Sequence, residues 1–90
     1  MPHPAFSAEQ RSLTVFLVRM RIAAGITQVE LAARLARPQS FVSKYERGER
    51  RLDTSEFAQI VEALSRDPVD AFATIYAEWR GGKAEEPQKA

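Results

Sequence analysis

The sequence predicts a small all-α domain, and three observations support this fold class. Apolar residues recur three and four positions apart, as they do along one side of a helix. Residues that commonly begin or end helices separate these apolar stretches. No two alternating apolar and polar segments are joined by the tight turn of a β-hairpin. With 90 residues, 44% of them hydrophobic, the chain can bury one core.

The first helix is expected over residues 8–24. Ser7 stands three positions before Gln10, which fits a capping box at the beginning of a helix. Gly25 is expected to follow its end. The expected buried stripe is Leu13, Phe16, Leu17, Met20 and Ala24. Three further apolar residues lie off this stripe, which indicates either cover on a second side or a face for a partner: Val15, Val18 and Ile22.

Two short helices with a tight connection should follow. Thr27 and Glu30 form a second capping-box pattern, which predicts a helix with Leu31, Ala32 and Leu35 on its inner face. Pro38 suits the beginning of a helix and prevents a continuous helix through the connector 36–38. The next helix is expected over residues 39–47, before Gly48.

Two further helices complete the predicted domain, which covers residues 8–80. Asp53 and Glu56 predict a helix to about Ser65, and Asp67-Pro68 predicts the beginning of the last helix. The apolar stripes of these two helices are Phe57, Ile60, Val61 and Leu64, and then Val69, Phe72, Ile75, Tyr76 and Trp79. Residues 1–7 are expected to be flexible and residues 81–90 disordered, because they lack apolar periodicity.

Charge is distributed unevenly along the chain. Residues 19–51 contain eight Lys and Arg against three Glu, a net charge of +5, whereas the remainder has five basic and nine acidic residues, a net charge of −4. The overall charge of +1 hides this separation. A basic region confined to one third of a chain predicts a binding surface for a polyanion.

The composition argues against several other classes of protein. There are no cysteines, and the single histidine, His3, lies between two prolines, so we expect no metal site and no cofactor. Neither a pair of catalytic carboxylates nor a glycine-rich phosphate loop is evident, so no enzyme is expected. No apolar run reaches the roughly 18–20 residues of a membrane span, and no secretory signal precedes the domain, so we expect a cytoplasmic protein.

Two short helices joined by about three residues must cross at a large angle, which is the helix-turn-helix geometry. The stretches ITQVELAARL (26–35) and QSFVSKYERGER (39–50) resemble the phage-repressor-like, XRE-type helix-turn-helix family. The family pattern has Thr/Ser-Gln-x-x-Leu-Ala in the first helix, then an apolar-Ser-x-apolar-Glu run followed by Gly. The resemblance extends over residues 17–72 and implies a five-helix, lambda-repressor-like domain that binds DNA, usually as a dimer.

The resemblance and the side-chain chemistry together suggest two sets of DNA contacts. Gln pairs with adenine, Lys with guanine and Ser with several bases, so the candidate base-reading residues are Gln39, Ser40, Ser43 and Lys44. The candidate contacts to the DNA backbone are Gln28, Arg37, Phe41, Arg47, Arg50 and Arg51. For the arginines, a solvated charged loop is the alternative. We expect Val42 and Tyr45 in the core. For Phe41 two positions are open, one in the core and one facing outward toward a sugar edge or a thymine methyl group.

The resemblance also implies a buried ion pair between Arg21 and Glu46 that orients the second helix of the motif. Two residues depart from the family pattern. Ala36 stands where Gly is usual, and because a left-handed conformation costs Ala about 1 kcal/mol, we expect a turn of different construction. Pro38 stands where a Ser or Thr cap is usual, so it cannot accept a capping bond through a side chain.

The resulting hypothesis is a sequence-specific transcriptional regulator, possessing no separate effector domain. It would bind a near-palindromic operator in double-stranded DNA as a homodimer, with residues 39–47 in the major groove. The candidate dimer residues are Phe72, Ile75, Tyr76 and Trp79, for which packing within one chain is the alternative. An antitoxin, or another module that binds a partner protein and DNA only secondarily, is the alternative function.

Overall fold

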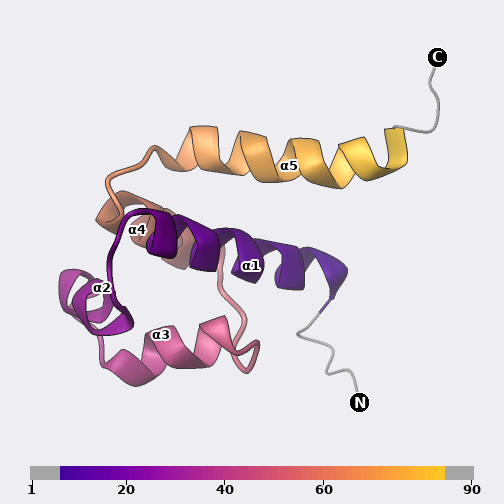
Figure 1. Ribbon diagram of the computed structural model, residues 1–90. Helices are drawn as coiled ribbons and strands as arrows, with labels where there is room; N and C mark the ends of the chain where they lie inside the picture. The colour runs from indigo at the N-terminus through magenta and orange to yellow at the C-terminus, as the bar shows by residue number, and fades with distance from the viewer. Residues whose placement is uncertain (1–6, 85–90) are drawn as a thin grey trace.

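The computed structural model describes residues 7–84, and the part described consists of five α-helices without a strand (Figure 1). These are α1 (Ala8–Ala23), α2 (Gln28–Leu35), α3 (Gln39–Glu46), α4 (Thr54–Ala63) and α5 (Pro68–Ala84). The predicted all-α class is confirmed. The flexible start and most of the disordered tail predicted from the sequence, residues 1–6 and 85–90, lie outside the described residues.

One apolar core holds the helices together. α2 packs against α3 and α4, whereas α1 packs against α3 and α5, so α3 is contacted from two sides (Figure 1). The side chains that are completely buried come from every helix: Leu17, Leu31, Val42, Tyr45, Ile60, Val61 and Ile75. Burying apolar side chains of this size stabilises the fold by about 1.5–3 kcal/mol each before the entropy cost of ordering the chain.

Side-chain caps define the beginnings of most helices. The capping boxes predicted at Thr27 and Asp53 are both formed, with Glu30 and Glu56 as the reciprocal partners. At Ser7 one half of the box is present, because the hydroxyl accepts a hydrogen bond from the Gln10 backbone N–H at 3.1 Å. α3 is different, since its N-cap is Pro38 and no side chain caps it. Its position must therefore depend on contacts with other helices.

The turn between α2 and α3 contradicts one expectation from the sequence. Ala36 adopts the left-handed conformation, with φ 56° and ψ 42°, which is the geometry that glycine provides in the family pattern. The turn closes through a hydrogen bond of 3.0 Å from the Arg37 N–H to the Ala32 carbonyl. The prediction of a different turn was wrong because packing of α2 and α3 outweighs a local cost of about 1 kcal/mol.

Two predictions about α5 are also corrected. The helix continues to Ala84, beyond the boundary at residue 80, because Gly81 and Gly82 do not interrupt it. Ile75, a candidate dimer residue, is completely buried against the core of its own chain, so it cannot form a dimer surface. The outer side of α5 instead exposes Val69, Phe72 and Tyr76.

Among residues 7–84, no single helix has the length and apolarity required to cross a membrane. Only α1 and α2 taken together are long and apolar enough, and the chain bends by 103° between these two helices.

Replacing Ala36 with glycine should raise the free energy of unfolding by about 1 kcal/mol, because glycine adopts the left-handed conformation without steric cost. Chemical denaturation measures this change. Ala33→Gly is the matched control, since Ala33 is exposed in the right-handed part of α2 and its replacement should lower stability by about 1 kcal/mol. A loss of stability in both variants would show that the conformation of residue 36 is not strained.

Candidate nucleic-acid interface

α3 has one buried side and one polar, exposed side. Val42 and Tyr45 are completely buried, as predicted, whereas Gln39, Ser40 and Lys44 are exposed. Ser43 is half-buried at the edge, with its hydroxyl 3.4 Å from the Ser40 carbonyl oxygen. The exposed side thus presents an amide, hydroxyl groups and an ammonium group, which are the groups that bind base edges.

Glu46, the last residue of α3, connects this helix to α1 through an ion pair with Arg21. The Arg21 guanidinium donates two hydrogen bonds to the carboxylate, at 2.8 and 3.1 Å. The side chains are 14% and 7% exposed, so solvent screens them little. A third bond runs from Arg21 to the Ile26 carbonyl at 2.8 Å. The bonds to Glu46 raise the pKa of Arg21, so the guanidinium remains charged.

Gln28, the first residue of α2, extends this network to the exposed side of α3. Its amide nitrogen donates to Glu46 Oε1 at 2.8 Å, and its amide oxygen accepts from Gln39 Nε2 at 3.3 Å. One chain of hydrogen bonds therefore links Arg21, Glu46, Gln28 and Gln39. Gln28 therefore connects Gln39, the first candidate base-reading residue, to the Glu46 carboxylate at the other end of α3.

Tyr45 lies beside this network and is entirely buried. Burial raises the pKa of its phenol well above the usual range, so the ring remains neutral. Its hydroxyl has no hydrogen-bond partner within the part of the chain that the structure describes. Its ring packs edge-on against Phe41, with centroids 5.5 Å apart.

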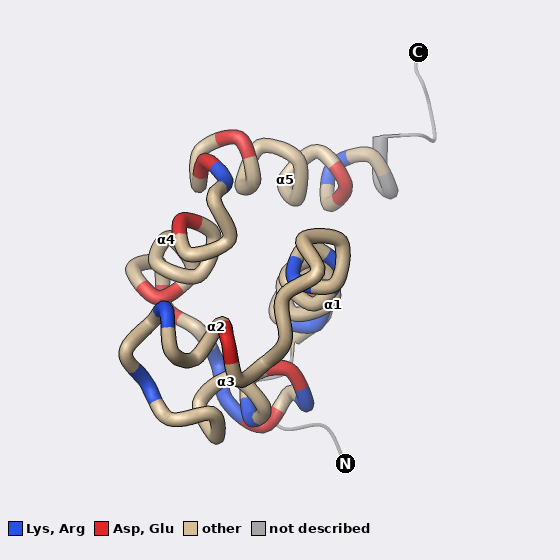
Figure 2. Tube along the Cα trace, turned by 60° about the vertical axis from the view of Figure 1, so that its left-hand side comes forward, with Lys and Arg blue, Asp and Glu red and all other residues tan. Residues whose placement is uncertain are grey.

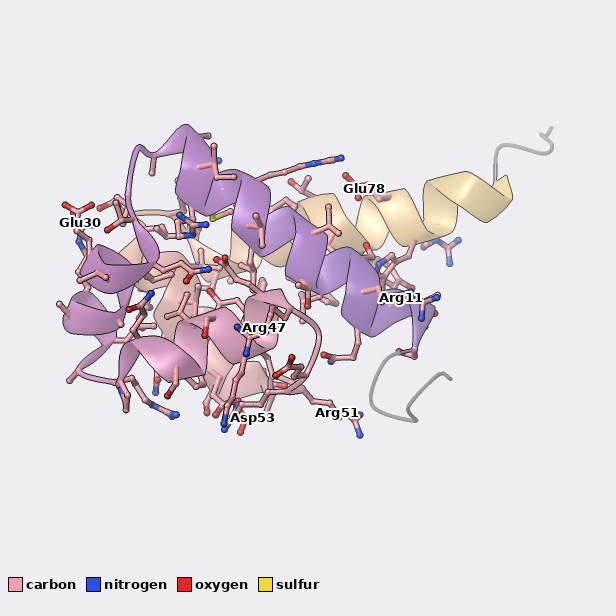
Figure 3. The ribbon with its side chains drawn as sticks, turned by 60° about the horizontal axis from the view of Figure 1, so that its bottom comes forward. Arg11, Glu30, Arg47, Arg51, Asp53 and Glu78 are labelled. Atoms are coloured by element: carbon pink, nitrogen blue, oxygen red, sulfur yellow. The ribbon has the colours of Figure 1, made fainter. Side chains whose placement is uncertain are left out.

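The loop after α3 presents Arg47 and Arg51 on the side of the molecule that Figure 3 turns toward the viewer. Arg47 donates two hydrogen bonds to Glu49, at 2.9 and 3.1 Å, and both side chains are more than half exposed. Those bonds lower the pKa of Glu49. Figure 2 shows basic segments on α3 and on the two connections that flank it, with acidic segments beside them and further basic segments on α1.

The remaining predicted backbone contacts form a cluster around Glu56. Arg50 donates two hydrogen bonds to this carboxylate, each 2.9 Å long, and Arg37 approaches it to 3.5 Å. The bonds from Arg50 lower the pKa of Glu56 to about 2. The sequence predicts Glu56 as a capping residue but does not reveal these ion pairs, because no periodic spacing connects residues 37, 50 and 56.

The structure contradicts an outward position for Phe41, a candidate contact to the DNA backbone. Its side chain is buried. The guanidinium carbons of Arg37 and Arg50 lie 4.2 and 4.8 Å from the centre of its ring. Tertiary contacts cover a helix position that the family pattern suggested would be exposed. Phe41 therefore cannot contact DNA in this conformation.

Between residues 7 and 84, no three His, Asp or Glu side chains lie close enough together to hold a metal ion.

Glu46→Gln should lower the free energy of unfolding by about 3 kcal/mol, because it leaves the Arg21 charge half-buried without an anion. Glu49→Gln is the control, since the Arg47–Glu49 pair has almost the same bond lengths at the exposed surface. Chemical denaturation should detect little change there, because solvent screens exposed pairs. Equal losses in the two variants would contradict a special role for Glu46.

Comparisons with known proteins agree with this geometry. The sequence model of a helix-turn-helix domain family matches residues 12–73. Among solved structures, an XRE-family-like protein from Pseudomonas syringae pv. tomato is 49% identical, with 79% of this chain and 87% of that chain covered and a TM-score of 0.76. A variant of the restriction–modification controller protein C.Esp1396I is 25% identical, with 80% and 91% covered and a TM-score of 0.73.

The clp gene regulator ClgR from Corynebacterium glutamicum is 22% identical, with 90% of this chain and 86% of that chain covered and a TM-score of 0.71, and this likeness shows the fold alone. No curated protein sequence matches the chain. The match to the domain model and the 49% identity settle the family. The chain belongs to the XRE-type helix-turn-helix family and is a DNA-binding transcriptional regulator.

Proposed function

We propose that the chain binds a specific operator by placing α3 in the major groove. The observation that carries this proposal is the row of exposed polar side chains on α3, of which Gln39 is hydrogen-bonded through Gln28 to Glu46. A helix needs an exposed, well-oriented polar side to distinguish base pairs, and α3 has one. Gln39, Ser40, Ser43 and Lys44 read bases, whereas Arg47 and Arg51 contact phosphates and provide affinity without sequence preference.

The exposed aromatic side of α5 supports a homodimer. Phe72 and Tyr76 are nearly half exposed, and their rings stack with centroids 5.8 Å apart. Trp79 is half-buried behind them, and its indole N–H donates to the Ser12 hydroxyl at 3.0 Å. An apolar groove lined by Leu13, Phe57 and Phe72 adjoins this surface. Two subunits paired through α5 would present two copies of α3 to a near-palindromic site, with half-sites about 34 Å apart.

Selection from a random pool of duplex DNA at about 0.15 M salt tests sequence-specific binding, because non-specific phosphate binding is weakened there. We expect an enriched, near-palindromic sequence.

Lys44→Ala should relax the preference at one base pair of each half-site and weaken binding by about 1–3 kcal/mol. Arg51→Ala should weaken all sequences equally and lower the salt slope by about 1. An unchanged preference in Lys44→Ala would remove α3 from the reading role.

Replacing Phe72 and Tyr76 together with glutamine should convert the dimer to a monomer, because it removes exposed apolar area from the proposed interface. Light scattering coupled to size-exclusion chromatography measures the mass in solution. Ala77→Gln is the control, since residue 77 is exposed on another side of α5 and should not alter the mass. A wild-type chain that remains monomeric would favour the alternative in which this surface binds a partner protein such as a toxin.

A further inference from the structure

A cluster of four side chains beside α3 joins segments on both sides of that helix. We refer to Arg37, Phe41, Arg50 and Glu56 as the Phe41 cluster. Arg37 lies immediately before the N-cap of α3, Arg50 follows its C-terminal end, and Glu56 belongs to the first turn of α4. Phe41 is 7% exposed, whereas the Arg37 and Arg50 side chains that lie over its ring are more exposed.

Two kinds of contact restrain the guanidinium groups. Both guanidinium carbons lie within 5 Å of the ring centre, at 4.2 Å for Arg37 and 4.8 Å for Arg50, which is the range of cation–π attraction. The Glu56 carboxylate accepts two hydrogen bonds from Arg50 and lies 3.5 Å from Arg37. An arginine side chain is flexible, so fixing it before a ligand arrives removes part of the ordering cost of binding.

Glu56 is itself fixed by the beginning of α4. Its Oε1 atom accepts a hydrogen bond from the Asp53 backbone N–H at 3.0 Å, while the Asp53 carboxylate accepts from the Glu56 N–H at 2.8 Å. The same carboxylate therefore completes the cap of α4 and holds both arginines. The carboxylate that binds the guanidinium groups is thus itself tied to the backbone of α4.

The charges of the cluster do not cancel. The four side chains together carry a net charge of +1, from two guanidinium groups and one carboxylate, and the arginine side chains are 37% and 39% exposed. The Asp53 carboxylate outside the cluster also acts on Arg50. The low pKa of Glu56, about 2, means that this balance holds at neutral pH. A phosphodiester of the DNA backbone carries one negative charge and accepts hydrogen bonds from paired guanidinium groups.

We propose that Arg37 and Arg50 form one phosphate-binding pair for the DNA backbone, and that Phe41 is its positioning residue. The ring and the Glu56 carboxylate hold the guanidinium groups at a fixed place relative to α3. The phosphate bound there adds affinity beside α3 without distinguishing base pairs. Phe41 thus acts on DNA through the two arginines without touching it. This inference rests on the proposed function, since it requires binding to duplex DNA.

The test uses the duplex enriched by selection, with single backbone phosphates replaced one at a time by uncharged methylphosphonates. The wild-type chain should lose about tenfold in affinity when the phosphate bound by the pair is neutralised, as expected for one charge-assisted contact. Arg37→Gln/Arg50→Gln and Phe41→Leu should both be insensitive at that position. Their base preference should remain that of the wild type. Arg66→Gln, which changes an exposed arginine on the connection between α4 and α5, should keep the sensitivity.

Salt dependence separates positioning from stability. Arg37→Gln/Arg50→Gln should lower the salt slope by about 0.9 for each phosphate that the variant no longer binds, and Phe41→Leu should lower it in the same direction. Adding Phe41→Leu to the arginine double variant should change affinity no further, because the ring acts through the arginines. If Phe41→Leu does not fold, Phe41→Met provides a flexible apolar side chain without a ring.

Two results would overturn the proposal. The first is a Phe41 variant that retains the wild-type pattern of methylphosphonate sensitivity, which would limit the ring to packing. The second is a pattern in which no backbone position depends on Arg37 and Arg50. In both cases selection would still enrich a sequence, so the proposed function would stand. A wild-type chain that enriches no sequence would overturn the proposed function together with this inference.

Discussion

The ion pair between Arg21 and Glu46 is the interaction on which the position of α3 depends. α3 has eight residues and no side-chain cap at its beginning, and a helix of that length has little stability by itself in water. Arg21 from α1 and Gln28 from α2 both bind the carboxylate at its end. Three helices therefore meet at one buried charge, and removal of that charge would leave the Arg21 guanidinium half-buried without an anion.

A second carboxylate, Glu56, has a comparable role on the other flank. It connects the first turn of α4 to arginines on both sides of α3, and the guanidinium groups of these arginines lie over the Phe41 ring. α3 is therefore held at its C-terminal end by one polar network and along its side by another, while Val42 and Tyr45 fill the core beneath. The outer side presents exposed polar side chains, of which Gln39 is also bonded to Gln28, and this is consistent with a surface that selects a DNA sequence.

Much of this structure could be predicted from the sequence because the signals are local. Capping residues such as Thr27 and Asp53 act within one helical turn, and the Arg21–Glu46 pair followed from the family pattern. The failures involve packing that apolar spacing does not reveal. Ala36 takes a left-handed conformation where α2 and α3 pack, Phe41 is covered by Arg37, Tyr45 and Arg50, and Ile75 is buried in the core. Local patterns do not record which side of a helix another element will cover.

The most direct test of this account is an amide NMR titration of the chain with the duplex enriched by selection. We expect the largest changes in amide chemical shift at Gln39, Ser40, Ser43 and Lys44 and in the loop of residues 47–51. The amides of Arg21 and Glu46 should change little, because the buried pair is already formed before DNA binds. Changes centred on α5, with α3 unaffected, would contradict the assignment of α3 as the DNA-reading helix.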